Sequence, residues 1–277
     1  MRDDFAVFIL SHGRADCLTT VTAIQNSGYS GKWFILIDDL DDQKEKYISN
    51  FGDHVIVFDK KLWAEKTDTI TSTGDLRSVV FARNACQSIA KEMGLSFFAE
   101  FDDDLMFFQI RWDNSGKLSG QRVRNLDEVF EAMIEFQQIS GAVSIGFANT
   151  GGFLGGVKGN FKKGLQRSIH QAFILRTDMP IEFKGLLNED VNATEIANFT
   201  GKLAFEICFL TEEAPVCSSN SGGLNDLYKA NDEYVRAFYT IIVCPSNLKI
   251  FDRRGSITLR RKSEISHPKI ISDRWKK

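Results

Sequence analysis

Short apolar segments alternate with helix-compatible segments in the first third of the chain, and this alternation restricts the fold more than any other feature of the sequence. Phe5–Leu10, Trp33–Ile37 and Val55–Phe58 are apolar runs of strand length. Between them, Cys17–Gln25 and Asp41–Asn50 have the composition of short helices. This βαβαβ order is typical of a parallel sheet covered by helices, so it predicts an α/β fold.

The middle of the chain continues this pattern and then changes it. A helix is expected from Asp75, with apolar residues three and four apart and Gly94 at its end. A strand over Ser96–Phe101 follows, then a β-hairpin over Leu105–Val123 around the turn Asp-Asn-Ser-Gly. Eight glycines between residues 141 and 164 indicate a loop that is mobile or faces a ligand. The remaining expected elements are helices over Leu126–Ile139, Glu189–Asn198 and Asn225–Tyr239, strands over Ala142–Gly146, Gln171–Leu175 and Leu203–Phe209, and an extended segment over Thr240–Val243.

Length and charge predict one domain with a basic end. A chain of 277 residues with 43% hydrophobic residues is long enough for one core but not for two full domains. The net charge is −3, yet residues 249–277 carry ten Lys and Arg against three Asp and Glu, a net of +7 that leaves −10 for residues 1–248. We therefore expect one α/β domain over residues 1–248 and a basic C-terminal segment over residues 249–277, packed on or next to the functional site.

The cysteines and the apolar runs exclude several classes of protein. Five widely spaced cysteines, without a C-x-x-C pair or clustered histidines, encode neither a disulfide framework nor a zinc site, so we expect reduced, buried thiols. No apolar run approaches the roughly 20 residues that cross a bilayer. The start MRDDF lacks the basic and apolar stretches of a signal peptide. The sequence thus predicts a cytoplasmic protein with no membrane partner.

Three adjacent aspartates directly follow the expected strand Ser96–Phe101. Asp102, Asp103 and Asp104 repel one another and cannot serve packing, so they must be solvated, paired with basic groups or neutralised by a metal ion. Ligands of open α/β sheets bind at the carboxyl ends of strands, which is where this run lies. Carboxylate oxygens suit Mg²⁺ or Mn²⁺, so the run predicts a metal site. The alternative is an acidic turn on the surface.

Further polar residues follow the first two strands. The turn Ser-His-Gly-Arg-Ala-Asp over residues 11–16 offers backbone N–H groups and a guanidinium to an anion or a base edge. Asp38 and Asp39 end the second strand, where a carboxylate can accept from an imide N–H or a ribose hydroxyl. The alternative for the two aspartates is a turn followed by a helix N-cap. Arg83 and Asn84 lie within the expected helix before the three aspartates, and the alternative to a role in the site is a solvated helical position.

Glu189 and Asp190 stand at the start of an expected helix. Acidic residues at this position usually complement the helix dipole, and that is the alternative to a role in chemistry. The functional interpretation gains weight from the other polar turns, because all of them follow apolar strands.

The order of these motifs resembles a known family. FILSHGRAD after the first strand, LIDD after the second, ARNA in a helix, FDDDL after the next strand and NEDV about 85 residues later are similar to the inverting glycosyltransferases of the GT-A fold. The resemblance covers residues 4–205 and implies a Rossmann-like mixed sheet flanked by helices. Within that class, ILSHGRAD resembles the TET-associated and phage-encoded DNA glycosyltransferases, including DNA arabinosyltransferases, which modify 5-hydroxymethyl pyrimidines.

The resemblance implies a role for each motif. Asp190 would be the catalytic base and Glu189 would orient the acceptor. A base in duplex DNA would have to leave the stack to reach Asp190, and Trp112, Phe147 or Phe153 could fill or line the gap. Mn²⁺ or Mg²⁺ would be held by Asp102 and Asp104, with His267 as a further ligand. The UDP-sugar donor would be surrounded by Ser11, Gly13, Arg14, Asp16, Asp38, Asp39, Arg83, Asn84 and Asp103.

The resemblance implies a DNA acceptor, and the basic residues are compatible with it. Lys and Arg that neutralise phosphates bind nucleic acid without reading its sequence. The expected DNA contacts are Arg122, Arg124, Lys162, Lys163, Arg260, Arg261 and Lys262. We therefore expect transfer of glucose or arabinose from a UDP-sugar to 5-hydroxymethylcytosine in phage DNA. The alternatives are a transferase acting on a glycan or a small molecule, for which the basic residues would be ordinary solvated faces, and a nucleotide-binding regulatory module without turnover.

Overall fold

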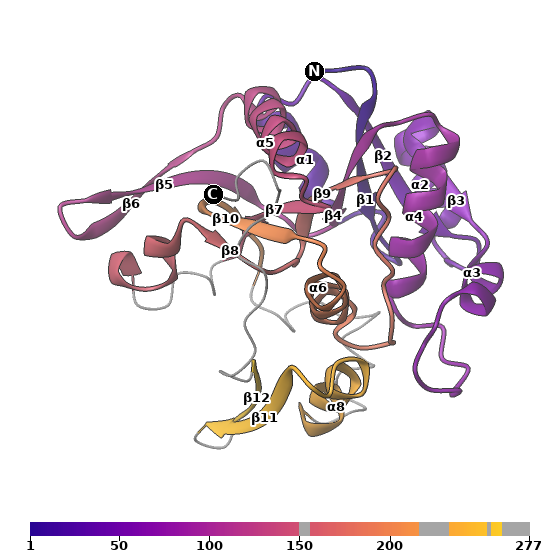
Figure 1. Ribbon diagram of the computed structural model, residues 1–277. Coiled ribbons are helices and arrows are strands. Elements are labelled where there is room, and N and C mark those ends of the chain that lie inside the picture. The colour runs from indigo at the N-terminus through magenta and orange to yellow at the C-terminus, as the bar shows by residue number, and fades with distance from the viewer. Residues whose placement is uncertain (150–155, 216–232, 254–255, 262–277) are drawn as a thin grey trace.

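A ten-stranded mixed sheet forms the centre of the protein (Figure 1). The computed structural model describes residues 1–149, 156–215, 233–253 and 256–261. The strands lie in the order β3-β2-β1-β4-β9-β7-β10-β5-β6, and β8 pairs with β10. Their bounds are β1 Phe5–Leu10, β2 Lys32–Asp38, β3 Val55–Phe58, β4 Phe97–Asp102, β5 Phe107–Asn114, β6 Lys117–Arg122, β7 Ser144–Ala148, β8 Leu165–Gln166, β9 Ala172–Arg176 and β10 Ala204–Glu213.

The first half of the sheet is parallel and the second half is mixed. β3, β2, β1 and β4 pair in parallel, which confirms the expected βαβαβ order. β9 then runs antiparallel to β4 and β7, β10 is parallel to β7, and β5 and β6 form the expected antiparallel hairpin. The expected fold class, a mixed α/β sheet flanked by helices, is therefore confirmed.

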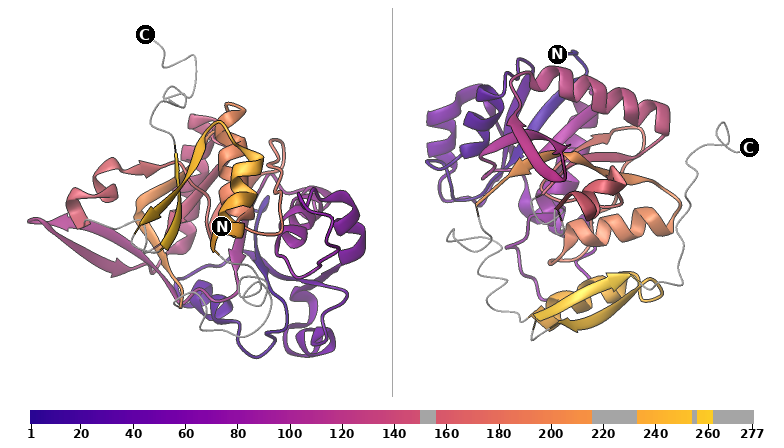
Figure 2. Two further views of the ribbon diagram at one scale, coloured as in Figure 1. Left: turned by 90° about the horizontal axis from the view of Figure 1, so that it is seen from below. Right: turned by 90° about the vertical axis from the view of Figure 1, so that its left-hand side faces the viewer.

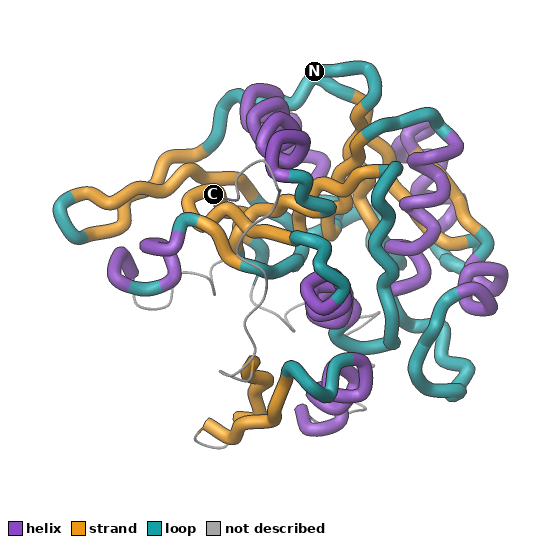
Figure 3. The backbone as a smooth tube through the Cα atoms, viewed as in Figure 1, coloured by secondary structure: helices purple, strands orange, loops and turns teal. Residues whose placement is uncertain are grey.

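Helices cover both faces of the sheet because the central strands are apolar on both sides. In β1, Phe5, Val7 and Ile9 pack with α1 (Thr19–Asn26) and α5 (Leu126–Ser140), whereas Ala6, Phe8 and Leu10 pack with α4 (Val80–Glu92) and α6 (Glu189–Phe199). Successive side chains of a strand point to opposite faces, so one six-residue strand supplies two cores. α2 (Lys44–Phe51) and α3 (Lys60–Lys66) lie beside β2 and β3 (Figure 3).

A third layer lies beyond α6. It consists of α8 (Glu233–Val243) and a two-stranded sheet of β11 (Leu248–Arg253) and β12 (Ser256–Arg261). Figures 1 and 2 show α6 between the main sheet and this layer. The extended segment expected over Thr240–Val243 is wrong, because α8 continues through Val243. The start of the basic segment at residue 249 falls one residue inside β11.

Two further expectations need correction. α3 was not expected from the sequence, although Asp59 caps it by accepting a hydrogen bond from the N–H of Leu62 at 2.8 Å. Cys17 is exposed, because it lies in the turn before α1 and not within the helix. Cys86, Cys208 and Cys244 are buried as expected and form no disulfide among the described residues, and Cys217 lies outside those residues. In the part of the chain that the structure describes, no helix is both long enough and apolar enough to cross a membrane.

Candidate active site

The carboxyl ends of β1, β2 and β4 lie side by side and bring three polar turns together. β1 and β4 pair with Leu10 opposite Asp102, and the N–H of Ser11 donates to the carbonyl of Leu36 in β2 at 3.1 Å. The turn after β1, the end of β2 and the aspartates after β4 therefore meet at one edge of the sheet, where α/β proteins bind their ligands.

Asp103 is buried and holds the turn after β1. Its Oδ2 accepts a hydrogen bond from the Ser11 hydroxyl at 2.6 Å, and its Oδ1 accepts one from Arg14 at 2.5 Å. The Tyr47 hydroxyl of α2 lies 2.7 Å from Ser11 Oγ and accepts from the Arg14 N–H at 2.8 Å. Burial raises the pKa of Asp103, although Arg14 and Ser11 oppose the shift. Both oxygens of Asp103 thus have protein partners, and the residue positions Ser11 and Arg14.

Asp38, at the end of β2, is buried between two basic side chains. Its Oδ2 lies 2.8 Å from His12 Nδ1 and 3.0 Å from Lys60 Nζ. Burial would raise the pKa of Asp38, but His12 and Lys60 outweigh it, and the pKa is lowered. The N–H of Gly13 donates to Asp41 at 2.8 Å. The Asp38 carboxylate and the Gly13 N–H are therefore both used to hold the turn.

Two other candidate nucleotide ligands are exposed at the rim of the site. Asp39 accepts from the backbone N–H of Lys60 at 2.8 Å, and Asp16 pairs with Lys46. Asp39 thus satisfies an N–H of the first turn of α3 that has no partner within the helix. This contact resembles the helix N-cap that the sequence left open as the alternative for Asp38 and Asp39.

Arg83 of α4 is the cation at the centre of a group of carboxylates. Its side chain is only 2% exposed, and its Nη1 lies 3.5 Å from Glu100. Its Nη2 donates to Asp102 at 3.0 Å and its Nε donates to Glu189 at 3.2 Å. Burial raises the pKa of Asp102 to about 7 and that of Glu100 to about 8, and Arg83 opposes both shifts. Arg83 thus pairs with carboxylates of the protein itself.

The acidic pair stands in the first turn of α6, joined to Asp102 through Arg83. Asn188 precedes it with a left-handed φ of 56°, and its side chain donates to the carbonyl of Arg236 in α8 at 2.8 Å. Glu189 is buried, and burial raises its pKa. Burial would also raise the pKa of Asp190, but His170 outweighs it, and this pKa is lowered. Of the two neighbours, Asp190 is the carboxylate whose pKa is lowered.

Three residues of this cluster were not expected from the sequence: His170, Glu206 and Glu212. His170 Nδ1 lies 3.6 Å from Asp190, and its Nε2 lies 3.2 Å from Glu206 in β10. Glu212 is 1% exposed, and its Oε1 has no hydrogen-bond partner among the described residues. Burial and the nearby Asp102 raise the pKa of Glu212 to about 8. The available signal was a pair of glutamates inside an apolar strand, because a buried carboxylate needs a partner.

The cluster holds more carboxylates than cations, which fits a divalent metal ion. Arg14, Arg83 and His170 face the carboxylates of Asp102, Asp103, Asp104, Glu189, Asp190, Glu206 and Glu212. Within the described ranges, no three His, Cys, Asp or Glu side chains are arranged to hold a metal ion by themselves. A cation bound here would take its remaining ligands from substrate phosphates and water, as Mg²⁺ usually does. His267 lies outside the described residues, so its role stays a prediction.

Comparison with known proteins identifies the family. Residues 5–205 match the family described as TET-Associated Glycosyltransferase. The chain belongs to this family. No curated protein matches it. The similar solved structures include glucosyl-3-phosphoglycerate synthase from Mycobacterium tuberculosis in complex with Mg²⁺ and UDP, which is 10% identical with a TM-score of 0.45 over 95% of this chain and 89% of that chain. S. aureus TarS 1-349 in complex with UDP-GlcNAc is 14% identical with a TM-score of 0.47 over 86% of this chain and 66% of that chain.

The matched region of this TET-associated glycosyltransferase contains every carboxylate of the cluster except Glu206 and Glu212. The expectations of the family and of a glycosyltransferase are therefore confirmed. The roles of individual residues stay predictions.

The β5–β6 hairpin of the glycosyltransferase projects beyond the rest of the sheet (Figure 1). Ile110 and Trp112 are 41% and 43% exposed, and they share one face because they are two residues apart in a strand. Arg122 lies on the other face, with its guanidinium 4.3 Å from the centre of the Phe107 ring. Arg124 follows the hairpin and is exposed.

The other expected DNA contacts are only partly visible. Lys162 is exposed in the short 3₁₀ helix Asn160–Lys163. Arg260 and Arg261 lie in β12, but their side chains and that of Lys163 are not described, and Lys262 lies outside the described residues. The expectations for these residues stay predictions.

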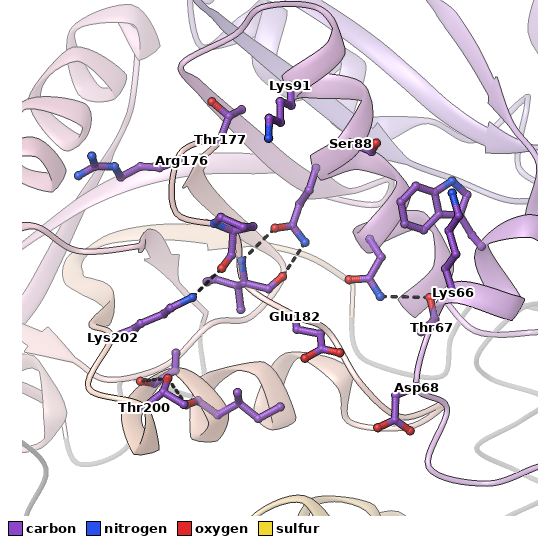
Figure 4. A pocket seen from close by; sticks show the side chains of 17 residues that line it. Lys66, Thr67, Asp68, Ser88, Lys91, Arg176, Thr177, Glu182, Thr200 and Lys202 are labelled. Carbon is purple, nitrogen blue, oxygen red and sulfur yellow. Dashed lines mark hydrogen bonds between the residues drawn. The ribbon is translucent and has the colours of Figure 1, made fainter.

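A pocket of about 540 Å³ lies between α4, α6 and residues 176–182 (Figure 4). Its described lining includes Lys91 and Lys202 but no carboxylate of the cluster around Arg83, so it is separate from the candidate active site. Asn84 belongs to this pocket: its side-chain amide donates to the carbonyl of Phe183 at 2.9 Å and accepts from the N–H of Phe183 at 3.2 Å. Asn84 therefore holds the segment that leads into α6, and we do not retain it as a nucleotide ligand.

Proposed function

We propose that this glycosyltransferase transfers glucose or arabinose from a UDP-sugar to the hydroxymethyl group of 5-hydroxymethylcytosine in phage DNA, with inversion at the anomeric carbon. The observation that carries the proposal is the meeting of the carboxyl end of β4 with the first turn of α6, joined through Arg83. The Asp102–Asp104 run and Asp190 belong to the two segments that Arg83 joins, which supports a shared site.

Asp190 is the base in this proposal. The hydroxymethyl oxygen forms a bond to the anomeric carbon while the bond from that carbon to the UDP oxygen breaks, and the hydroxyl proton moves to Asp190. A base must be ionised and accessible to do this. Asp190 meets both conditions, because its pKa is lowered and its side chain is 25% exposed.

The donor side of the site is formed by the turn after β1 and the aspartates after β4. Asp102 and Asp104 would hold Mg²⁺ or Mn²⁺, which supplies positive charge against the departing diphosphate. Arg14 lies 3.9 Å from Asp104 and adds a second positive group near it. The complexes of the mycobacterial synthase contain Mg²⁺ or Mn²⁺ together with UDP or UDP-glucose, which supports this choice of metal and donor.

Two observations support DNA as the acceptor. The description of the family links it to TET proteins. The projecting hairpin and the residue after it expose Trp112, Arg122 and Arg124, which suit a polyanion with stacked bases. A base within a duplex must leave the stack to reach Asp190, and Trp112 is an exposed aromatic of the hairpin that can contact the opened stack.

The decisive experiment incubates the protein and Mn²⁺ with DNA containing 5-hydroxymethylcytosine and a panel of nucleotide sugars. Mass spectrometry of the nucleosides should show the addition of one glucose or one arabinose residue. The DNA acceptor is refuted if no donor gives a modified nucleoside while the protein transfers sugar to a glycan or a small acceptor in a metal-dependent reaction.

The variant Asp190→Asn tests the base. Turnover should fall about 10²- to 10⁴-fold, because the amide keeps the shape of the side chain but cannot accept the proton. UDP affinity should be unchanged. Asp178→Asn is the matched control. Asp178 is an exposed carboxylate that follows the C-terminal end of β9 and pairs with Arg176. An Asp190→Asn enzyme that keeps more than about a tenth of the wild-type rate is incompatible with this role.

A further inference from the structure

His170 lies between two carboxylates, with one ring nitrogen directed at each. Its Nδ1 is 3.6 Å from Asp190 Oδ2 at the start of α6, and its Nε2 is 3.2 Å from Glu206 Oε1 in β10. The second oxygen of Asp190 accepts a hydrogen bond from the N–H of Val191 at 2.7 Å. Each carboxylate oxygen of the proposed base therefore has one partner supplied by the protein.

The segment that carries His170 is fixed on three sides. The Ile169 N–H donates to Thr194 Oγ1 at 2.9 Å, and this hydroxyl donates to the carbonyl of Asp190 at 2.9 Å. Ser168 donates to Glu206 Oε2 at 2.9 Å. On the other side, the carbonyl of Gln171 accepts from the N–H of Asp102 at 3.0 Å. The position of the imidazole is thus set by α6, β10 and β4 together, unlike that of a surface ion pair.

The charges around His170 favour its protonated form. The groups that face it are Asp190 from α6 and Glu206 and Glu212 from β10. Burial alone would lower the pKa of His170, but these carboxylates raise it to about 9. His170 is therefore an imidazolium at neutral pH, with a proton on each ring nitrogen.

We propose that His170 is a positioning residue for Asp190: the imidazolium, held from its far side by Glu206, fixes the orientation of the Asp190 carboxylate and keeps it ionised until the acceptor arrives. This inference rests on the proposed function, in which Asp190 is the base. During transfer the acceptor O–H bond breaks and the proton binds Asp190. His170 is already protonated, so it takes no proton and acts through orientation and charge.

A purely structural ion pair would stabilise the fold without affecting the protonation of the base, and the pH dependence of turnover separates the two roles. In the wild type, kcat should fall on the acid side as Asp190 takes up a proton and on the alkaline side near pH 9 as His170 loses one. In His170→Gln, kcat should fall about 10- to 100-fold at neutral pH because the base is no longer held. The acid limb should move to higher pH and the alkaline limb near 9 should vanish.

The matched control is His54→Gln. His54 is a histidine outside the cluster that stacks on Trp33 with ring centres 3.7 Å apart, so its replacement should leave kcat and both limbs unchanged. In His170→Gln the affinity for UDP should also be unchanged, since His170 touches neither the turn after β1 nor the aspartates after β4 through its ring. Combined with Asp190→Asn, His170→Gln should add less than twofold, because the residue it positions is already inactive.

Glu206→Gln gives an independent test that holds even if His170→Gln does not fold. Loss of one facing carboxylate should move the alkaline limb to lower pH by about 0.5 units or more while the protein still binds UDP. The inference is overturned if the pH profile of kcat is unchanged in both variants. It is also overturned if His170→Gln is slower and has a lower Tm but keeps the wild-type pH profile, because that result indicates a structural ion pair.

If Asp190→Asn turns over normally, the proposed base itself has failed. If Asp190→Asn is inactive and His170→Gln is normal, only the role of His170 has failed.

Discussion

Replacing Arg83 by methionine should destabilise the protein strongly, and more strongly as the pH rises. Arg83 is 2% exposed and lies within 3.5 Å of Glu100, Asp102 and Glu189. Methionine has a similar length and keeps the packing but removes the charge. Removing one partner of a buried ion pair costs about 3–5 kcal/mol, because the remaining charges stay uncompensated.

The pH dependence follows from the raised pKa values of two of these carboxylates. The pKa values of Glu100 and Asp102 are about 8 and about 7, above those of an unfolded chain, so the folded protein binds more protons than the unfolded one. Their contribution to stability is present at low pH and lost as the pH rises through these values. Without Arg83 both pKa values rise further. The free energy of unfolding of the wild type then levels off above pH 8. That of the variant continues to fall by up to about 1.4 kcal/mol per pH unit for each group.

Urea unfolding at pH 6 and pH 9 measures this difference. We expect a destabilisation of about 3 kcal/mol at pH 6 and about 5 kcal/mol or more at pH 9. Arg77→Met is the matched control: Arg77 is 53% exposed, so loss of its pair with Asp75 should cost less than about 1 kcal/mol at either pH. Adding Glu100→Gln to Arg83→Met should restore part of the loss at pH 9. A destabilisation below about 1 kcal/mol, or one that does not change with pH, would refute the account of Arg83 as the cation that neutralises the cluster.

Two further predictions concern packing and thiol reactivity. Gly146→Ala should lower stability by about 1–3 kcal/mol, because the new methyl carbon would stand 2.9 Å from the carbonyl oxygen of Ala172. Gly120→Ala, whose nearest contact is the flexible side chain of Gln109 at 3.3 Å, should cost much less, and equal thermal shifts for the two variants would contradict this reasoning. Brief alkylation followed by peptide mapping should modify exposed Cys17 well before Cys86, whose thiol is buried with its pKa raised by that burial, and equal rates would show that the core around Cys86 opens readily.

The first half of the fold could be predicted because its information is local. Phe5–Leu10 is apolar at all six positions and buried at all six, as expected for a central parallel strand with helices on both faces. The edge where β1, β2 and β4 end followed from this order, and the motifs after these strands lie there. α3 was missed because only the cap at Asp59 identified it and its seven residues show too little periodicity.

The second half of the site could not be predicted, because it is assembled from segments that are distant in sequence. His170 comes from the loop before β9, whereas Glu206 and Glu212 lie within β10. Nothing near position 170 in the sequence indicates two carboxylates, since these approach only when β9 pairs with β4 and β10 pairs with β7. The same limit applies to Arg83: its helical spacing fits a solvated position, and only the tertiary structure shows that it is buried among carboxylates.

The pKa values of two carboxylates that face His170 are shifted in opposite directions, which separates their roles. Glu212 has a buried oxygen without a hydrogen-bond partner among the described residues, and burial raises its pKa to about 8. Asp190 is flanked by the imidazolium of His170, and its lowered pKa keeps it ionised and able to accept a proton. When the environment drives the pKa values of adjacent acids apart, the ionised group can serve as the base and the neutral one cannot. Under the proposed function, Asp190 therefore suits the role of proton acceptor better than Glu212, because contact with His170 lowers the pKa of Asp190 whereas burial raises that of Glu212.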